Sequence, residues 1–276
     1  MKVTLLLLIG FLLQPATGFS QKTKLKKNPP GTVQVNDSLY VDVTEIANVE
    51  WREYLHYLLD SKDTLAYEQA LPDTNVWDAD TILNSRQMYY SFRHPGFNSY
   101  PVVGVSYEQA NEFCKWRTYV ANFVVYITAN DFKDWKLHLS DSFPILYYYR
   151  LPTAAEWETI AAGKYSTEQY PYGYPDVYVK WKGKQQRAFN CNYKSQPYPA
   201  REPVYSFYTS PTGSFFKNSS GIKNMIGNVA EMVAEKGVAK GGSFFHQLED
   251  CKIVLNQQYE KPERWLGFRC VAIKID

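Results

Sequence analysis

A short turn near the C-terminal end of the chain contains the residue types with the most chemical potential. Gly241 and Gly242 precede Ser243, and His246 and Cys251 follow it. An imidazole and a thiolate can bind a transition metal such as copper, and a histidine can activate a cysteine as a nucleophile. A serine after two glycines is more typical of a turn than of catalysis. The pattern alone therefore leaves metal binding, thiol chemistry and a structural turn open.

The remaining histidines and acidic residues form no recognisable catalytic pattern. His56, His94 and His138 are scattered along the sequence and lack the spacing of metal ligands. The sequence places no two carboxylates in a shared cleft, so hydrolase chemistry has no support. The candidate catalytic residues are therefore confined to the turn.

The composition is that of a folded globular protein. The chain has 276 residues, with 30 Lys and Arg against 28 Asp and Glu, a formal net charge of +2. This balance argues against a nucleic-acid-binding protein, which would carry a basic stripe. Aromatic residues make up 16% of the chain. Because each can bury roughly 150–250 Å², a large core can form without long aliphatic runs.

The N-terminal segment has the features of a secretory signal peptide. Lys2 supplies a positive charge, an apolar run over residues 5–13 follows, and small residues mark cleavage sites after Gly18 or Ser20. The run is shorter than the roughly 20 residues of a membrane span, although a retained anchor is the alternative. We expect residues 1–20 to be removed and the mature chain to have no transmembrane segment.

The mature chain is predicted to be exported and to be periplasmic, outer-membrane-associated or secreted. Residues 21–30 are predicted to form a flexible, basic leader, and residues 31–276 one domain. Export would permit disulfide bonds, and the four cysteines allow one or two.

Three helix starts are visible in the domain. Asn48 can cap a helix whose apolar positions follow helical spacing. Ser106 with Gln109, and Thr153 with Glu156, have the spacing of capping boxes. We therefore expect helices to begin at these three places.

Short β-type runs account for much of the remaining domain. The clearest are residues 32–35, 39–43, 203–207, 238–244 and 268–273. Residues 164–220 show no sustained helical or strand periodicity, which indicates a long loop. A loop of this length normally needs a metal or disulfide tether, or has a function. Few helices, short strands and long irregular loops indicate an α+β domain.

Five separated segments, in this order, resemble the formylglycine-generating enzyme family, the sulfatase-modifying factor domain. They are residues 42–48, 101–110, 150–158, 227–233, and 240–243 together with 267–270. The resemblance runs from about residue 30 to residue 276. It implies a variant of the C-type lectin fold with limited regular secondary structure.

Further stretches suggest a closer subgroup within the family. Residues 71–77, 94–97, 100–105 and 113–118 resemble the gliding-motility and type IX secretion lipoproteins of Bacteroidetes. Those proteins use this fold without known formylglycine chemistry. This chain differs from them because it is short and lacks the lipid-bearing cysteine.

The resemblance implies a calcium site in residues 224–231. The matching ligands are the side chains of Asn224 and Glu231 and the carbonyl groups of Gly227 and Val229. Calcium binds six to eight hard oxygen ligands, including carboxylates and carbonyls, so these residue types suit the ion. The alternative is a turn in which Glu231 caps a helix or forms an ion pair.

A second metal site of the family is matched only at Asn190 and Cys191. No carboxylate for this site can be identified in the sequence.

The resemblance also bears on catalysis. In the family's oxidases two cysteines after the Gly-Gly-Ser turn bind copper, which activates O₂, but here the first of them is His246 and only Cys251 remains. Ala230 and Met232 stand at the two positions where the family has tryptophans that line the pocket. We therefore expect no copper and a chain that has lost the oxidase chemistry. A metal-dependent oxidase using Cys251 and His246 is the alternative.

The family pattern pairs Cys114 with Cys270 in a disulfide bond. The remaining two cysteines, Cys191 and Cys251, either form a second bond that locks the long loop or leave Cys251 free beside His246.

These observations predict a structural or interaction component of the bacterial envelope. Its partners would be envelope proteins, as in gliding and type IX secretion, and not nucleic acid. Lectin-like ligand binding is a further alternative, which rests on fold analogy and aromatic content alone.

Overall fold

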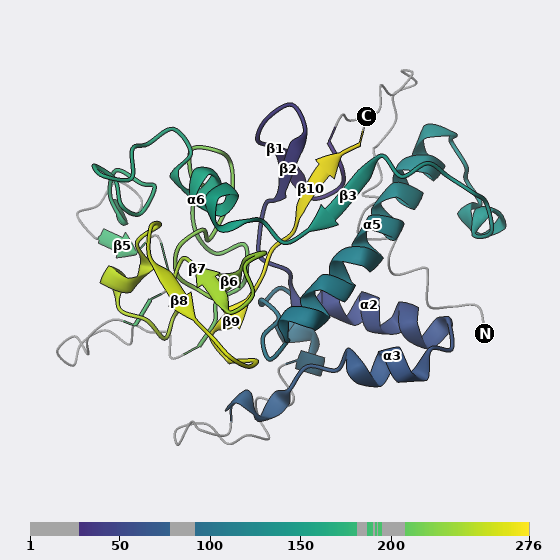
Figure 1. Ribbon diagram of the computed structural model, residues 1–276, viewed down its shortest axis with the longest axis horizontal. Helices are drawn as coiled ribbons and strands as arrows, with labels where there is room; N and C mark the ends of the chain where they lie inside the picture. The colour runs from purple at the N-terminus through teal and green to yellow at the C-terminus, as the bar shows by residue number, and fades with distance from the viewer. Residues whose placement is uncertain are drawn as a thin grey trace.

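In the computed structural model, a four-stranded antiparallel sheet separates two hydrophobic cores (Figure 1). The structure describes residues 28–77, 92–180, 187–189, 191, 193–194 and 208–275. The strands lie in the order β1 (Thr32–Gln34), β2 (Leu39–Asp42), β10 (Val271–Lys274) and β3 (Tyr147–Arg150). The strand nearest the C-terminus therefore pairs with β2, one of the first, and closes the fold.

Alternate side chains of this sheet enter different cores. Tyr40 and Ala272 belong to the first core, whereas Leu39, Val41 and Val271 belong to the second. Because neighbouring residues of a strand point to opposite faces, the apolar runs of β2 and β10 are buried on both sides.

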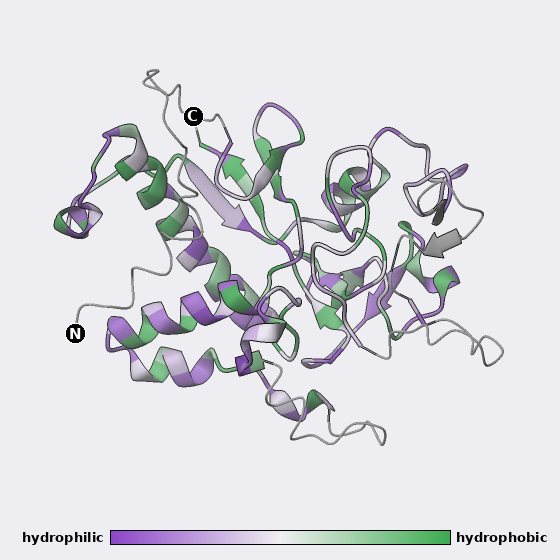
Figure 2. Cartoon of the chain, turned by 180° about the vertical axis from the view of Figure 1, so that it is seen from behind, coloured by the Kyte–Doolittle hydropathy of each residue, from purple (hydrophilic) through white to green (hydrophobic). Residues whose placement is uncertain are grey.

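Three helices cover the first core. They are α2 (Asn48–Asp60), α3 (Thr64–Gln69) and α5 (Tyr107–Ala129). Trp51 of α2 stacks on Phe113 of α5 with ring centroids 5.4 Å apart, and Phe268 meets both rings edge-on. The colouring in Figure 2 alternates along these helices between hydrophilic and hydrophobic residues. The high aromatic content thus fills the core, as the composition predicts.

A second sheet and one helix cover the other core. The strands are ordered β8 (Asn256–Gln258), β7 (Val238–Lys240), β6 (Ala230–Met232) and β9 (Leu266–Gly267), and only β6 and β9 are parallel. The helix is α6 (Ala154–Ala162). A separate hairpin contains β4 (Tyr178–Lys180) and β5 (Arg187–Phe189). Short 3₁₀ helices are η1 (Thr74–Trp77), η2 (Pro95–Phe97), η3 (Trp135–His138) and η4 (Leu248–Cys251).

Helices begin at all three predicted places, and both predicted capping boxes are confirmed. Ser106 Oγ accepts the Gln109 N–H at 3.1 Å, and Gln109 Oε1 accepts the Ser106 N–H at 2.7 Å. Thr153 and Glu156 exchange the same two bonds. Such local bonds satisfy the free N–H groups of the first helical turn.

The predicted cap at Asn48 is wrong by one position. Asn48 is the first residue of α2, and Ala47 precedes the helix. The Glu50 carboxylate accepts the Ala47 N–H at 2.8 Å, while the Asn48 side chain donates to the Phe97 carbonyl. The asparagine therefore ties the helix to a distant loop instead of capping it.

Two of the predicted strands differ from the structure by more than one residue. β7 ends at Lys240 because Gly241 and Gly242 adopt positive φ angles of 88° and 64°, which turn the chain. The run over residues 268–273 is divided, because β10 begins only at residue 271 and the preceding β9 belongs to the other sheet. The predicted strand 203–207 lies outside the described residues.

The structure describes the beginning of the predicted domain but not the predicted signal peptide. Of the leader, only residues 28–30 are described. Among the helices that are described, none is both long and apolar enough to cross a membrane.

Side chains of α5 close the outer edge of β3. The Asn122 carboxamide accepts the N–H groups of Leu146 and Tyr147 and donates to the Tyr147 carbonyl, and Thr118 Oγ1 accepts the Tyr149 N–H. Asn122 is 1% exposed. An unpaired strand edge would otherwise carry free backbone groups, so a helix side chain here takes the place of another strand.

We predict that Asn122→Leu destabilises the protein strongly, because it leaves several buried backbone groups without partners. Each such group costs about 1–3 kcal/mol, so the free energy of unfolding should fall by about 3 kcal/mol or more in urea denaturation. Asn111→Leu is the matched control on the same helix, because Asn111 makes one local bond to the Tyr107 carbonyl. A difference between the two variants below about 1 kcal/mol would contradict the edge-closing role.

Candidate functional site

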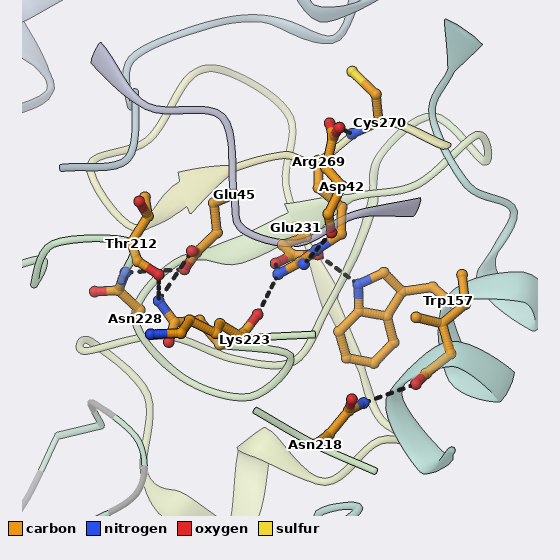
Figure 3. Close-up of polar contacts among 12 residues, drawn as sticks. Asp42, Glu45, Trp157, Thr212, Asn218, Lys223, Asn228, Glu231, Arg269 and Cys270 are labelled. Carbon is orange, nitrogen blue, oxygen red and sulfur yellow. Dashed lines mark hydrogen bonds and ion pairs between the residues drawn. The ribbon is translucent and has the colours of Figure 1, made fainter. Parts of the chain in front are cut away.

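A buried ion pair lies where the two sheets meet (Figure 3). Arg269 follows β9 and Glu231 is on β6, and neither side chain is more than 1% exposed. The Arg269 guanidinium donates to Glu231 Oε2 at 2.7 Å and to Oε1 at 2.5 Å. The parallel pairing of β6 with β9 positions the two residues, and the two parallel N–H bonds fix the angle between them.

The pair is also bonded to three other segments. Trp157 Nε1 of α6 donates to Glu231 Oε2 at 2.7 Å. The guanidinium donates to the carbonyl groups of Asp42 at 3.1 Å and Lys223 at 2.9 Å. Burial alone would lower the pKa of Arg269, but the Glu231 carboxylate raises it above its usual value. The Arg269 guanidinium is therefore charged.

A second buried acid, Glu45, lies beside this pair. Its two carboxylate oxygens accept the side-chain amides of Asn224 at 3.0 Å and Asn228 at 2.9 Å. Burial raises the pKa of Glu45 to about 8, with Arg269 opposing the shift and Glu231 adding to it. A carboxylate in this position favours either a proton or a nearby cation.

The amide oxygen of Asn224, one of the two amide donors to Glu45, is left over in this network. Asn224 Oδ1 is buried and accepts no hydrogen bond from the described residues. The amide nitrogen of Asn224 donates to Glu45 and to the Thr212 carbonyl. These two bonds hold the carboxamide in place, so it cannot rotate to bring its oxygen to a donor. Buried acceptors without donors are rare in folded proteins, and a hard cation is one partner that would satisfy this one.

The predicted calcium ligands fit a cation only in part. Asn224 and Glu231 lie at the two ends of the predicted loop, but the Glu231 carboxylate is already bound by Arg269 and Trp157. Glu45, which sequence reasoning missed, is the carboxylate next to the Asn224 amide. The described residues contain no cluster of three His, Cys, Asp or Glu suited to a metal. A cation here would therefore combine the single carboxylate of Glu45 with amide and carbonyl oxygens, which suits calcium.

The calcium site stays a prediction, as do its carbonyl ligands at Gly227 and Val229. The second predicted metal site cannot be assessed in full. Asn190 lies outside the described residues, and Cys191 is buried in the second core.

The Gly-Gly-Ser turn packs tightly against this network. A side-chain carbon at Gly241 would lie 2.6 Å from the Met225 carbonyl oxygen, and one at Gly242 would lie 2.5 Å from the Cys251 sulfur. The Gly227 N–H donates to the Gly241 carbonyl at 2.8 Å. Close backbone approach explains both glycines, and it joins the turn to the predicted calcium loop.

The structure brings two of the three predicted catalytic residues together. Ser243 Oγ lies 2.8 Å from His246 Nδ1 and accepts the Phe245 N–H at 3.1 Å. The donor in this contact is set by the tautomer of the imidazole, because the hydroxyl can donate to an unprotonated Nδ1 or accept from Nδ1–H. Burial lowers the pKa of His246, so the ring is neutral. Ser243 itself is fully buried.

Cys251 has the environment of a packed thiol. Its sulfur lies beneath Gly242 and donates to the Gln247 carbonyl at 3.4 Å. Burial raises the pKa of the Cys251 thiol well above its usual value. A reactive or metal-binding cysteine needs the opposite shift, toward the thiolate.

All four cysteines are free thiols in the structure. The Cys114 and Cys270 sulfurs face each other 3.5 Å apart in the first core, farther than the roughly 2.05 Å of a disulfide bond. Cys191 and Cys251 both belong to the second core. The two disulfide bonds therefore stay predictions.

Sequence reasoning missed the partners of the predicted ligands. Glu45 and Arg269 lie inside segments that resemble the family, but nothing in their spacing assigns them to Asn224 and Glu231. These contacts join residues 179 and 38 positions apart. Only the sheet pairing brings them together.

Comparisons with known proteins identify the family. The model of the sulfatase-modifying factor enzyme 1-like domain matches residues 4–274. Similar solved structures include PvdO from Pseudomonas aeruginosa, at 19% identity and a TM-score of 0.42, with 64% of this chain and 63% of that chain covered. CarF has 17% identity and a TM-score of 0.48, over 89% of this chain and 96% of that chain.

Treponema denticola variable protein 1 has 16% identity and a TM-score of 0.45, over 90% and 92% of the two chains. A search of curated proteins gives no match. The family match extends over nearly the whole chain, and the few helices, short strands and long loops agree with the predicted α+β variant of the C-type lectin fold. The chain therefore belongs to the sulfatase-modifying factor family, whose members include the formylglycine-generating enzymes.

Proposed function

We propose that this chain keeps the scaffold of the family without its copper oxidase chemistry. The observation that carries the proposal is the state of Cys251, whose thiol is buried beneath Gly242 with a raised pKa. His246 occupies the other position that a copper thiolate would need, and its Nδ1 is engaged by Ser243. Two accessible thiolates are thus not available in this turn.

We further propose that the chain acts as a structural or interaction component of the bacterial envelope. The predicted signal peptide supports export. The resemblance of residues 71–77, 94–97 and 100–105 to gliding-motility and type IX secretion proteins supports the envelope role. A rigid, non-catalytic scaffold suits this role, because binding surfaces are most specific on elements that do not move.

The catalytic part of the proposal predicts no turnover. The reduced, copper-supplemented chain should consume no O₂ with a cysteine-containing peptide, and Cys251→Ala should behave identically. Turnover that is lost in Cys251→Ala would establish the alternative oxidase that uses Cys251 and His246.

The interaction part is tested in the native envelope. Chemical cross-linking followed by affinity purification of the tagged full chain should recover a discrete partner in stable ratio. An unlinked, monomeric chain under these conditions would contradict the interaction role while leaving the result of the oxygen assay unaffected.

We also propose that calcium binds beside Asn224 and Glu45. The support is the buried Asn224 oxygen without a donor and a buried carboxylate whose nearest bonded partners are neutral amides. The bound ion would neutralise Glu45 and join residues 224–231 to the end of β2. Its role would be structural.

Calcium should therefore raise the melting temperature relative to EGTA, whereas magnesium should do so less because it demands a stricter geometry. At a calcium concentration one hundred times Kd, the free energy of unfolding should rise by about 2.7 kcal/mol. Glu45→Gln should abolish the calcium effect. Glu108→Gln, which removes an exposed partner of Lys236, is the control and should retain it. Equal melting in calcium and EGTA would refute the site.

A further inference from the structure

A buried lysine in the second sheet lies between a carboxylate and an amide. Lys240 is on β7, and its side chain is fully buried. Its Nζ donates to Glu158 Oε1 of α6 at 2.6 Å and to Asn256 Oδ1 of β8 at 2.9 Å. Lysine side chains are almost never fully buried unless they are paired, so the fold holds these three groups together as one cluster.

The strand register brings the lysine and the asparagine together. Lys240 is directly opposite Asn256 in the antiparallel pair of β7 and β8. In the same ladder the Tyr259 N–H donates to the Gly237 carbonyl, and opposite residues alternate between hydrogen-bonded and non-hydrogen-bonded pairs. Three positions further along, Lys240 and Asn256 therefore form a non-hydrogen-bonded pair, in which the side chains are closer.

Glu158 is in position to act as a base toward the lysine. An ammonium group is not a nucleophile, and a base has to lie within about 2.6–3.2 Å of the atom whose proton it takes. Glu158 Oε1 is 2.6 Å from Lys240 Nζ. The amine left by this proton transfer is a nucleophile, and it already contacts the oxygen of the Asn256 amide. Asn256 is exposed on the edge strand, so a small leaving group can escape to solvent.

From this geometry we propose that Lys240 and Asn256 condense to form an isopeptide bond, with Glu158 as the general base and acid. The Lys240 ammonium passes one proton to Glu158, and the resulting amine attacks the side-chain carbonyl carbon of Asn256. A bond from that carbon to Nζ forms, and its bond to Nδ2 breaks. The departing nitrogen takes up the proton held by Glu158 and the second proton lost by the amine, and it leaves as ammonium. Glu158 returns to its carboxylate, and no oxidant or cofactor is consumed.

The contact between the groups makes this condensation feasible, although free amides resist attack by amines. Well-oriented intramolecular groups reach effective molarities of about 10⁵–10⁸ M. The new bond joins β7 to β8 and closes a ring over residues 240–256, which contains the Gly-Gly-Ser turn, His246 and Cys251. Because a covalent cross-link restricts the unfolded chain, it stabilises the turn without a disulfide bond. This inference does not depend on the proposed envelope role.

The test is mass spectrometry of a tryptic digest of the folded full chain, made from fresh protein and after several days of incubation. A branched peptide should join Lys240 to Asn256 with the loss of one molecule of ammonia, and trypsin should not cut after Lys240. Asn256→Ala removes the electrophile and Lys240→Arg removes the amine, so neither should give the branched peptide. Glu158→Gln keeps a hydrogen-bond acceptor but cannot take the proton, and it should lower the linked fraction by at least about tenfold.

Gln258→Ala is the matched control, because Gln258 is exposed on the same strand two positions away. It should keep the full linked fraction, and it should melt at a higher temperature than Asn256→Ala, which lacks the bond. Circular dichroism verifies that the variants fold. If Lys240→Arg does not fold, the exposed Asn256→Ala substitution still removes the linkage in a folded chain.

Complete tryptic cleavage after Lys240 in the wild-type chain, with an unmodified Asn256, would overturn the inference. The three side chains would then form only an ion pair and a hydrogen bond. An unchanged linked fraction in Glu158→Gln would contradict the role of the carboxylate. Neither result would alter the oxygen assay or the recovery of an envelope partner, so this inference and the proposed function fail separately.

Discussion

The buried pair between Arg269 and Glu231 is the constraint on which the rest of the structure depends. Removing two charges from water is costly, and a buried pair is tolerated only when other hydrogen bonds complete it. Here Trp157 and the carbonyl groups of Asp42 and Lys223 supply those bonds. The guanidinium thus joins the first sheet, the second sheet and the loop before residue 224, in a fold that has little regular secondary structure to do so.

The two features of functional interest are built on this pair. Glu231 is on β6, which pairs with β7, and β7 leads directly into Gly241 and Gly242. The predicted calcium loop precedes Glu231 on the other side. The turn that follows buries the Cys251 thiol that an oxidase would have to expose.

The sequence predicted features that depend on near neighbours in the chain. The capping boxes at Ser106 and Thr153 form because each hydroxyl reaches the free backbone N–H group three residues further along the helix. The helix predicted at Asn48 is present, but the cap is wrong because the Asn48 side chain bonds to the distant Phe97 carbonyl instead. Sequence reasoning also missed α3, which has no buried residue and therefore no apolar stripe to recognise.

Contacts between distant segments could not be predicted in the same way. The family resemblance paired Cys114 with Cys270, and these residues do lie face to face, but the partnership of Glu45 with Asn224 and Asn228 had no local signal. Nor could a sequence pattern indicate that Asn122 closes the edge of β3, because strand pairing decides which edge is left open.

The central claim is that the Arg269–Glu231 pair supports the scaffold through its two-pronged, buried geometry. Replacing Arg269 by Lys keeps the charge but loses the fork and the bonds to the carbonyl groups. Arg150→Lys is the control, because Arg150 makes a similar fork to Glu156 at a partly exposed site. In urea denaturation, the free energy of unfolding should fall by about 3 kcal/mol or more for Arg269→Lys and by less than about 1 kcal/mol for Arg150→Lys. Equal, small losses for both variants would contradict the account.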